Sequence, residues 1–373
     1  MELYDLASPV ENFLAAKADF TRTPLGGTME LLPLCNMDCK MCYVRLSREQ
    51  MNQQGQMLNC TEWLRIAEDA KKNGVLFLLL TGGEPFLYPE FERLYAELTQ
   101  MGFIITINTN GTLINEKWAD LLAKYPCRRL NITLYGADDA TYEKLCNNPS
   151  GFTQIMKAVD LLKERKIPFR FNCSITPHNV EQLPKLYEIA RKKETHLEAC
   201  SYMFPPARKR DFAKNYVRLT PKQAAQSMFD SFQCRCPDMG MDAAVKNTLA
   251  KVKDVTPERL NEISKTTLNG LGCRAGRSGF WINWQGELLP CGMFDKPKIS
   301  LLEHSFEECW KYIVEETAKL TRCRECESCS KKEICKTCAA ACLTETGHMD
   351  GKPEYLCQMT EACYQMLLDH EKK

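Results

Sequence analysis

The chain has 373 residues, a formal net charge of +1 and 21 cysteines. A charge so close to zero gives no general attraction to nucleic acid or to a membrane surface. No apolar run approaches the ~20 residues that a membrane-spanning helix needs, and the N-terminus lacks the basic start of a secretory signal. The sequence therefore predicts a cytoplasmic protein with neither nucleic acid nor membrane as a partner.

The cysteines are too many for an ordinary cytoplasmic protein, where thiols stay reduced and disulfide frameworks are rare. Metal or iron–sulfur ligation is therefore the favoured interpretation. Between residues 43 and 272 the cysteines stand singly, apart from Cys234 and Cys236, whereas from Cys273 to Cys363 they are dense. This change in density predicts a domain boundary at residue 273.

From residue 28 onward, apolar runs of strand length alternate with amphipathic helical patterns, after a lead-in over 1–27 with one short helix. About six β/α units fit before residue 203, which predicts an α/β fold with a parallel sheet. Because eight units close a barrel, six imply a partial (β/α)6 barrel that is open on one side. The expected strands cover 28–34, 75–80, 103–108, 129–135, 169–175 and 197–203, with helices over 61–73, 89–101, 115–124, 152–165 and 180–193.

The rest of the chain divides into a connector over 204–272 and a cysteine-rich C-terminal domain over 273–373. The connector begins with the basic run Arg208-Lys209-Arg210, which is either a solvated linker or a docking patch for an acidic peptide. Two helices are expected over 221–265. In the C-terminal domain, a hairpin with a Gln-Gly turn is expected over 281–290, and a helix over 306–320.

The first expected strand leads into three cysteines, Cys35, Cys39 and Cys42, at the spacing C-x3-C-x2-C. Three thiolates are one fewer than a fully protein-ligated [4Fe–4S] cluster takes, so one iron of such a cluster would be open to a small molecule. A zinc loop or three unrelated thiols are the alternatives. Structural zinc prefers paired C-x2-C motifs and a closed site, which fits this loop poorly.

Three further turns follow the second, third and fourth strands, at the end of a β/α barrel where active sites lie. They cover 81–85, 108–111 and 133–136, and the first reads Thr-Gly-Gly-Glu-Pro. Paired glycines permit close approach of the backbone to a ligand, and Glu84 can accept hydrogen bonds from an ammonium group. Taken alone, the glycines also fit a plain tight turn.

The cysteine motif followed by Tyr43, with Gly82-Gly83-Glu84-Pro85 after the next strand, resembles the radical S-adenosylmethionine (SAM) superfamily across residues 28–202. The resemblance implies a [4Fe–4S] cluster on Cys35, Cys39 and Cys42, with its fourth iron chelating the amino and carboxylate groups of SAM. It also implies an external electron donor of the flavodoxin or ferredoxin type, and a 5′-deoxyadenosyl radical that abstracts hydrogen from a substrate. The residues implied to contact SAM are Tyr43, Gly82, Gly83, Glu84, Asn108, Asn110, Thr133 and Tyr135.

The C-terminal cysteines follow the order Cys-x12-Gly-x4-Cys, then Cys-x2-Cys-x5-Cys, then later cysteines. Pairs at the spacing C-x2-C suit zinc, so two closed zinc sites are an alternative. Beside a radical SAM core, this order resembles the SPASM domain, which holds two auxiliary [4Fe–4S] clusters. The resemblance assigns Cys273 and Cys291 to the nearer cluster, and Cys326, Cys329, Cys335 and Cys357 to the outer one.

The remaining ligands of the nearer cluster stay open at this point. In the family a further cysteine usually follows the third one of the run at x3, but here Cys338 follows Cys335 at x2 and Cys342 lies x3 beyond. We take Cys342 by a small margin, and the fourth place falls to Cys338, Cys323 or the substrate. Cys234, Cys236 and Cys363 receive no role, and the cysteines expected to be buried apolar side chains are Cys60, Cys127, Cys146, Cys173, Cys200 and Cys309.

Because SPASM-containing radical SAM proteins mostly modify peptides, the resemblance implies a peptide or protein substrate. The favoured reaction is a thioether or carbon–carbon cross-link in a ribosomally made precursor. The alternatives are formylglycine formation in a sulfatase, dehydrogenation of a small molecule, and a non-catalytic zinc-binding interaction protein.

Two departures from the family pattern bear on that choice. Sulfatase-maturing members carry an aspartate directly after the cysteine that matches Cys291, whereas this chain has Gly292 there, with Asp295 three positions further as the candidate base. Only 34 residues precede Cys35, too few for a leader-binding domain. A separate leader-binding protein, or recognition without a leader, is therefore expected.

Overall fold

A computed structural model of the chain describes residues 8–205, 217–235, 241–253, 256, 258, 271–335 and 337–372. Its centre is one nine-stranded sheet in the order β6-β5-β4-β3-β2-β1-β7-β8-β9. Strands β1 to β6 pair in parallel, and the sheet is open between β6 and β9, so the predicted α/β partial barrel is confirmed. The strands are β1 (Gly26–Glu30), β2 (Phe77–Thr81), β3 (Ile104–Thr109), β4 (Arg129–Thr133), β5 (Phe169–Ser174), β6 (Leu197–Cys200), β7 (Gly279–Ile282), β8 (Glu287–Leu289) and β9 (Ile299–Ser300).

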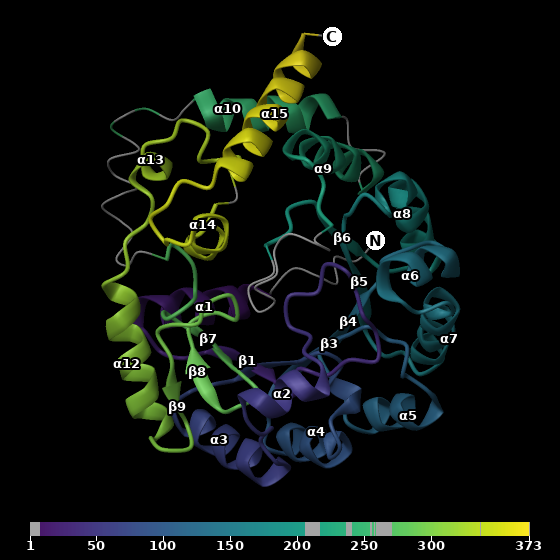
Figure 1. Cartoon of the computed structure of the whole chain (residues 1–373), viewed down its shortest axis with the longest axis vertical. Helices are drawn as coiled ribbons and strands as arrows, with labels where there is room; N and C mark the ends of the chain where they lie inside the picture. The colour runs from purple at the N-terminus through teal and green to yellow at the C-terminus, as the bar shows by residue number, and fades with distance from the viewer. Residues whose placement is uncertain are drawn as a thin grey trace.

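Helices cover the outer side of this curved sheet, and Figure 1 shows them as a ring around the strands. Strand residues that point outward are apolar and buried, for example Leu80, Ile107 and Ile132. Those that point inward are often polar, such as Asn108 and Asn131. The helices are α1 (Pro9–Thr21), α2 (Arg48–Gln54), α3 (Cys60–Lys72), α4 (Phe91–Gln100), α5 (Glu116–Lys124), α6 (Asp139–Cys146), α7 (Gly151–Glu164), α8 (Leu183–Lys192), α9 (Pro221–Arg235), α10 (Met241–Lys253), α12 (Phe306–Ala318), α13 (Arg324–Glu327), α14 (Ala339–Thr346) and α15 (Glu354–Glu371).

The predicted hairpin is present, and it extends the barrel sheet. Strand β7 pairs in parallel with β1, with Thr28 opposite Trp281, and β8 returns antiparallel to β7. Gly286 takes the turn between them with a φ of +82°, a conformation that glycine adopts without a steric penalty. The sequence did not indicate the β1–β7 pairing, which joins residues far apart in the chain. The domain division at residue 273 stays a prediction.

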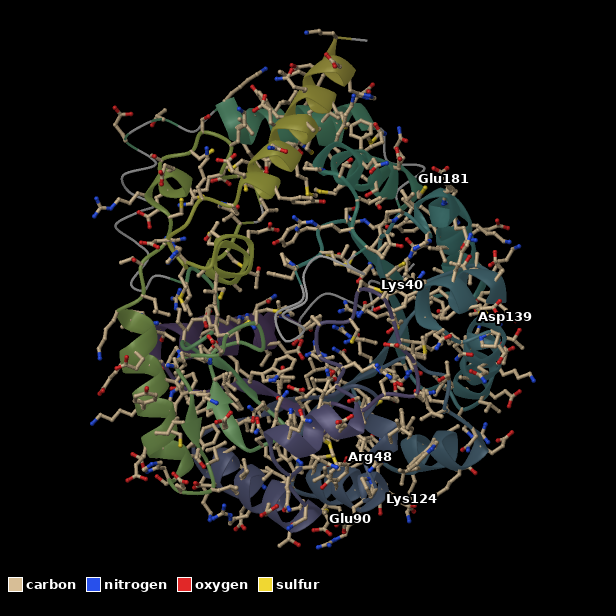
Figure 2. The ribbon with its side chains drawn as sticks, viewed as in Figure 1. Lys40, Arg48, Glu90, Lys124, Asp139 and Glu181 are labelled. Atoms are coloured by element: carbon tan, nitrogen blue, oxygen red, sulfur yellow. The ribbon has the colours of Figure 1, made fainter. Side chains whose placement is uncertain are left out.

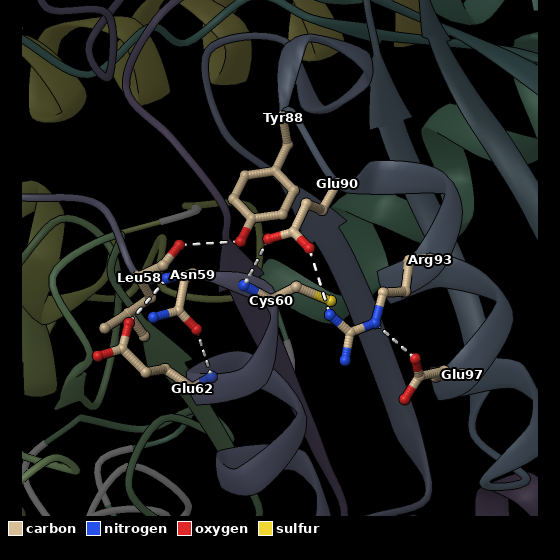
Figure 3. A network of polar contacts seen from close by, with 8 residues as sticks. All are labelled: Leu58, Asn59, Cys60, Glu62, Tyr88, Glu90, Arg93 and Glu97. Carbon is tan, nitrogen blue, oxygen red and sulfur yellow. Dashed lines mark hydrogen bonds and ion pairs between the residues drawn. The ribbon is translucent and has the colours of Figure 1, made fainter.

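A polar network anchors the segment after β2 to the start of α3 (Figure 3). The Tyr88 hydroxyl donates to the Leu58 carbonyl oxygen at 2.9 Å, and the Glu90 carboxylate accepts from the Cys60 backbone N–H at 3.3 Å. Arg93 holds Glu90 in place with an ion pair at 3.3 Å. The network joins the segment before α4 to the start of α3, and the Cys60 backbone takes part in it.

Several sequence expectations fall outside the described residues, among them the basic run Arg208-Lys209-Arg210 and Cys236. In the connector, α9 and α10 lie within the range where two helices were expected. Helices α2, α6, α14 and α15 were not predicted. Within the part of the chain that the structure describes, no helix combines the length and the apolar character that crossing a membrane requires.

Candidate active site

The cysteine loop leaves β1 at the carboxyl end of the sheet and docks on the last turn of α6. The Asp38 N–H donates to the Cys146 carbonyl oxygen at 3.0 Å, and the Lys40 N–H donates to the Leu145 carbonyl oxygen at 2.9 Å. Arg45 closes the loop with an ion pair to Asp38 at 2.8 Å. In Figure 2, Lys40 on this loop lies nearer the centre of the view than Asp139 at the start of α6. A short helix absent from the predictions therefore positions the loop.

Hydrogen-bond donors point at the loop sulfurs. The Met37 N–H lies 3.4 Å from the Cys35 sulfur, and the Arg45 N–H lies 3.3 Å from the Cys42 sulfur. Hydrogen bonds to sulfur stabilise thiolates and tune the reduction potential of iron–sulfur clusters. Soft thiolates with such donors fit a cluster of iron and sulfide.

The three loop thiols do not form a binding site for a single metal ion. Among the described residues, no three His, Cys, Asp or Glu side chains converge closely enough to hold one metal ion. Burial and the nearby Glu84 carboxylate raise the pKa of Cys35 to about 12, and a hydrogen bond to the Cys146 thiol together with burial raises the pKa of Cys39. A metal cluster must therefore displace protons from these thiols, which makes its binding favourable at higher pH.

Gly82 and Gly83 bring the turn after β2 against the chain that enters the cysteine loop. A Cβ on Gly83 would lie 2.1 Å from the Leu34 carbonyl oxygen, and one on Gly82 would lie 2.5 Å from the Leu32 carbonyl oxygen. The Gly83 N–H donates to the Leu32 carbonyl oxygen at 2.7 Å, and the Glu84 N–H donates to the Leu34 carbonyl oxygen at 2.9 Å. The close approach that the sequence predicted is thus made by two backbone segments of the protein itself.

We expect Gly83→Ala to lower the free energy of unfolding of the metal-free protein by about 1–3 kcal/mol or more, the usual cost of overpacking. The added methyl group meets backbone atoms, which cannot rotate away. Gly279→Ala is the matched control, because its Cβ would meet nothing closer than 3.4 Å. Urea unfolding of both variants measures the difference, and equal stability of the two would refute this account of Gly83.

Glu84 is a fully buried carboxylate that links the ends of β2 and β3. Its oxygens accept hydrogen bonds from the Thr109 hydroxyl and the Asn110 N–H, both at 2.8 Å, and from the Phe86 N–H at 3.3 Å. Burial raises the pKa of Glu84 to about 7 from 4.5, although these three donors favour the charged form. Glu84 is thus poised to change its charge when a positive group binds nearby.

The raised pKa predicts a pH dependence for the metal-free protein. Between about pH 4.5 and pH 7 the folded state binds the Glu84 proton more tightly than the unfolded state does, so stability falls as the pH rises. At about 1.4 kcal/mol per pKa unit, the loss is about 3 kcal/mol. Glu84→Gln should remove that part of the slope. Unfolding curves across this pH range test it, and identical slopes for both proteins would contradict it.

The other residues predicted to contact SAM fall into two sets. Asn110 lies at the cysteine loop, with its amide nitrogen 3.6 Å from the Cys35 sulfur and 2.8 Å from the Asn36 amide oxygen. Tyr135 also adjoins the loop: burial raises its pKa well above the ordinary value, and the neighbouring Cys39 thiol raises it further. Tyr43 follows the loop with 37% of its surface exposed.

The second set points elsewhere. Asn108 faces the interior of the barrel, where its amide oxygen accepts from the Asn131 side chain at 2.7 Å. The Thr133 hydroxyl donates to the Thr109 carbonyl oxygen at 3.3 Å, joining the ends of β4 and β3. The side chains of these two residues are hydrogen-bonded to protein neighbours on β3 and β4.

The C-terminal cysteines form two groups in space. Burial raises the pKa of Cys291, and the neighbouring Cys273 and Cys338 thiols raise it further. Cys291 and Cys338 also pack against the same small apolar cluster, which contains Leu271 and Phe294. We call Cys273, Cys291 and Cys338 the near cysteine group.

The outer cysteine group lies around α13 and α15. A hydrogen bond to the Cys342 thiol raises the pKa of Cys326, which also bonds to Cys323. Burial raises the pKa of Cys357 to about 11, with further contributions from Cys326 and Cys335. The geometry therefore places Cys338 with the near group and Cys342 with the outer one, the reverse of the small preference from sequence. The outer cysteine group consists of Cys323, Cys326, Cys335, Cys342 and Cys357, with Cys329 in the same segment.

Of the cysteines expected to be buried, Cys200 is the exception, because it ends the edge strand β6 and is exposed. The other five are confirmed as buried: Cys60, Cys127, Cys146, Cys173 and Cys309.

The candidate base Asp295 is exposed and lines a cavity of about 580 Å³ together with Glu345. Gly292, which stands where a sulfatase-type aspartate would be, packs under the Trp281 ring, and a Cβ there would lie 2.7 Å from that ring. The tryptophan thus occupies the space that a side chain at position 292 would need.

The segment that contains the cysteine loop and Glu84 is similar in sequence to known proteins. Residues 29–190 match the family model described as the Radical SAM superfamily, and this part of the chain is a radical SAM domain. This match favours the predicted radical SAM enzyme over the non-catalytic zinc-binding protein.

Two curated relatives and two solved structures illustrate the range of similar proteins. An AdoMet-dependent heme synthase of Methanosarcina barkeri is 23% identical over 89% of this chain and 96% of its own length. A PqqA peptide cyclase of Granulibacter bethesdensis is 29% identical over 45% of this chain and 44% of its own length. Streptococcus suis SuiB bound to precursor peptide SuiA has a TM-score of 0.66 at 18% identity, covering 95% of this chain and 82% of that one. Native anSMEcpe with bound AdoMet has a TM-score of 0.67 at 19% identity, covering 94% and 99%.

Proposed function

We propose that this protein cleaves SAM reductively and uses the resulting radical to cross-link a peptide substrate, through a thioether or a carbon–carbon bond. One observation carries the proposal: the three-cysteine loop lies beside buried Glu84 and Asn110 at the carboxyl ends of the parallel strands, within the segment that matches the radical SAM family. That arrangement supplies ligands for a [4Fe–4S] cluster with one open iron.

In this proposal Cys35, Cys39 and Cys42 would hold the cluster, and their number would leave one iron available to SAM. The bound cofactors supply electron transfer to the sulfonium and homolysis of its bond to the adenosyl group, giving a radical that removes hydrogen from the substrate. The protein supplies orientation and a site closed to water. Asn110 and Tyr135 lie beside the loop, and Tyr43 directly follows it in the chain.

Glu84 receives the SAM ammonium group in this scheme. A carboxylate offers about four acceptor positions, and three protein donors use the Glu84 oxygens. A positive charge beside it favours the ionised form and lowers its pKa from about 7. SAM binding at neutral pH therefore releases part of a proton from Glu84. Gly82 and Gly83 contribute by holding that turn against the cysteine loop.

The two C-terminal cysteine groups hold auxiliary [4Fe–4S] clusters in this proposal. The near group contributes Cys273, Cys291 and Cys338. Clusters held there would supply an acceptor for the electron that remains after hydrogen abstraction when the substrate is oxidised. An external flavodoxin- or ferredoxin-type protein supplies electrons for the first step. For the outer cluster the resemblance gives Cys326, Cys329, Cys335 and Cys357, and Cys342 and Cys323 lie close to them.

A peptide is the substrate class that two of the comparisons support, because a PqqA peptide cyclase and SuiB bound to its precursor peptide are similar to this chain. The packing of Gly292 under Trp281 argues against the sulfatase-type alternative. Dehydrogenation or another oxidation of a small molecule is the second candidate, because the heme synthase alignment covers 89% of this chain. A separate leader-binding protein remains part of the peptide proposal.

The experiment uses protein with its clusters reconstituted without oxygen, reduced with dithionite and supplied with SAM. Peptides encoded by reading frames next to the gene are added, and the products are analysed by mass spectrometry. A peptide that raises 5′-deoxyadenosine formation and loses two hydrogen atoms supports the proposal. If a small carboxylic acid raises 5′-deoxyadenosine formation and none of the peptides does, the peptide proposal is wrong. Oxidation of a small molecule, the second candidate, then replaces it.

A further inference from the structure

The turn from Cys329 to Cys335, in the segment of the outer cysteine group, holds the backbone of Lys332. The Lys332 N–H donates to the Cys329 carbonyl oxygen at 3.1 Å, and the Cys335 N–H donates to the Lys332 carbonyl oxygen at 3.2 Å. Lys332 is therefore built into the same turn as two cysteines that are proposed to hold the outer cluster.

The ammonium group of Lys332 is buried without a bonded partner. Its Nζ has no hydrogen-bond acceptor among the described residues, and it forms no ion pair with a described carboxylate. A charged amine that leaves water without a compensating partner carries a large desolvation cost. The surroundings of Lys332 therefore favour a negative group close to its Nζ.

The charged neighbours of Lys332 balance its charge only in part. Burial lowers the pKa of Lys332, and the Arg322 guanidinium lowers it further. Three groups act in the opposite direction, namely Glu327, Glu333 and the Cys326 thiol. Glu327 also lies 3.6 Å from the Arg322 Nε, so its charge is not available to Lys332 alone, and Glu333 is exposed.

The same neighbours show which way the Lys332 side chain points. Cys326 and Glu327, which interact with it, both belong to α13. The adjacent Lys331 points elsewhere, because its ammonium group pairs with Glu361 on α15. Of these two neighbouring lysines, Lys332 thus turns its charge toward the thiol of Cys326, whereas Lys331 has a carboxylate of its own.

An iron–sulfur cluster on the outer cysteine group fits these surroundings. Four thiolate ligands give a [4Fe–4S] cluster a net negative charge, and the charge and hydrogen bonds around its sulfurs set its reduction potential. An ammonium group has three donors and no acceptor, so it suits sulfur atoms that carry negative charge. The buried Lys332 Nζ therefore supports a cluster beside it on the evidence of its own environment.

We propose that Lys332 is a positioning residue for the outer cluster: its buried ammonium group lies beside that cluster and raises its reduction potential. This inference rests on the proposed function, in which the outer cysteine group holds a [4Fe–4S] cluster, and it adds the side chain that tunes that cluster. A nearby positive charge stabilises the reduced form, which has one more negative charge than the oxidised form. The effect should persist in added salt, because buried charges are screened much less than exposed ones.

The test is a redox titration of the reconstituted protein, followed by electron paramagnetic resonance. The signal that Cys326→Ala removes identifies the outer cluster. We expect K332M to make reduction of that cluster about tenfold less favourable, which corresponds to a midpoint potential about 59 mV lower for a one-electron couple. K332R keeps the positive charge and should retain most of the wild-type potential.

Lys331→Met is the matched control for K332M. It removes a lysine from the same turn, near Cys329, but one whose charge Glu361 already balances, so it should shift the potential much less. Thermal unfolding and iron content show whether each variant is folded and loaded. If K332M does not fold, K332Q carries the same comparison, because it also removes the charge.

An unchanged outer-cluster potential in folded and loaded K332M would overturn the inference, and so would an equal shift in Lys331→Met. An outer cysteine group without any redox signal, as zinc would give, would overturn it as well. Formation of 5′-deoxyadenosine is measured on the same preparations. Its absence from the wild-type protein would defeat the proposed function, whereas the inference is decided by the potential, so the two failures are distinguishable.

Discussion

Replacement of Cys35, Cys39 and Cys42 together by alanine will remove about four iron atoms per chain and abolish formation of 5′-deoxyadenosine. A [4Fe–4S] cluster needs its thiolate ligands, and the neighbouring Cys146 thiol is hydrogen-bonded to Cys39 of the same loop. The proposed auxiliary clusters should stay, because the cysteines proposed to hold them lie in the C-terminal segment. Iron analysis and chromatography of the SAM cleavage products give both readouts.

Cys60→Ala is the matched control for this experiment. Cys60 is fully buried at the start of α3, and its backbone N–H bonds to Glu90, so its thiol serves packing. The control protein should hold about twelve iron atoms, as expected for three [4Fe–4S] clusters, and cleave SAM at the wild-type rate. SAM cleavage by the triple alanine variant would contradict the placement of the active site.

The second large effect is expected at the near cysteine group. Cys338→Ala should remove about four iron atoms per chain and stop product formation, while cleavage of SAM at the cysteine loop continues. The reason is that Cys338 lies with Cys273 and Cys291, whose thiols interact with it. Iron content and peptide product measured on the same preparation check this.

Cys342→Ala discriminates between the two assignments. Cys342 is buried one helical turn into α14, and it bonds to Cys326 of the outer cysteine group. That variant should therefore keep the near cluster, and any iron it loses should come from the outer one. If the Cys342→Ala protein loses the near cluster and the Cys338→Ala protein keeps it, then Cys342 belongs to the near cysteine group and Cys338 does not.

The sequence predicted the parts of the fold that depend on local pattern. The alternation of apolar strands with amphipathic helices is read along the chain, so strands such as β2 and β3 were placed within a few residues. The prediction also placed the turns that follow these strands at one end of the sheet, which is correct because parallel strands run in the same direction. Glu84 and Asn110 meet the cysteine loop for that reason.

What the sequence could not predict depends on contacts between distant segments. Helix α6 has eight residues, too short for a clear periodicity, although Asp138 supplies its N-terminal cap. Its role in holding the cysteine loop is visible only in three dimensions. The choice between Cys338 and Cys342 depends in the same way on how α14 is oriented, since Cys338 stands at the N-terminal cap and Cys342 one turn further.

The inner layer of the barrel gave no sequence signal either. Arg129, Asn131 and Arg170 read as ordinary polar positions within strands. Only the register of β4 against β5, with Asn131 opposite Arg170, shows that the two arginines share one acceptor. Alternation along a strand predicts which residues share a face, but it does not say which residues of neighbouring strands meet.

The central claim is that the cysteine loop holds a cluster with one iron open to SAM. The most direct test is to reconstitute the wild-type protein without oxygen, reduce it with dithionite in the presence of SAM, and quantify both cleavage products. We predict 5′-deoxyadenosine and methionine in equal amounts, formed only by reduced protein. Protein that holds its full complement of iron and yet forms no 5′-deoxyadenosine would contradict the claim.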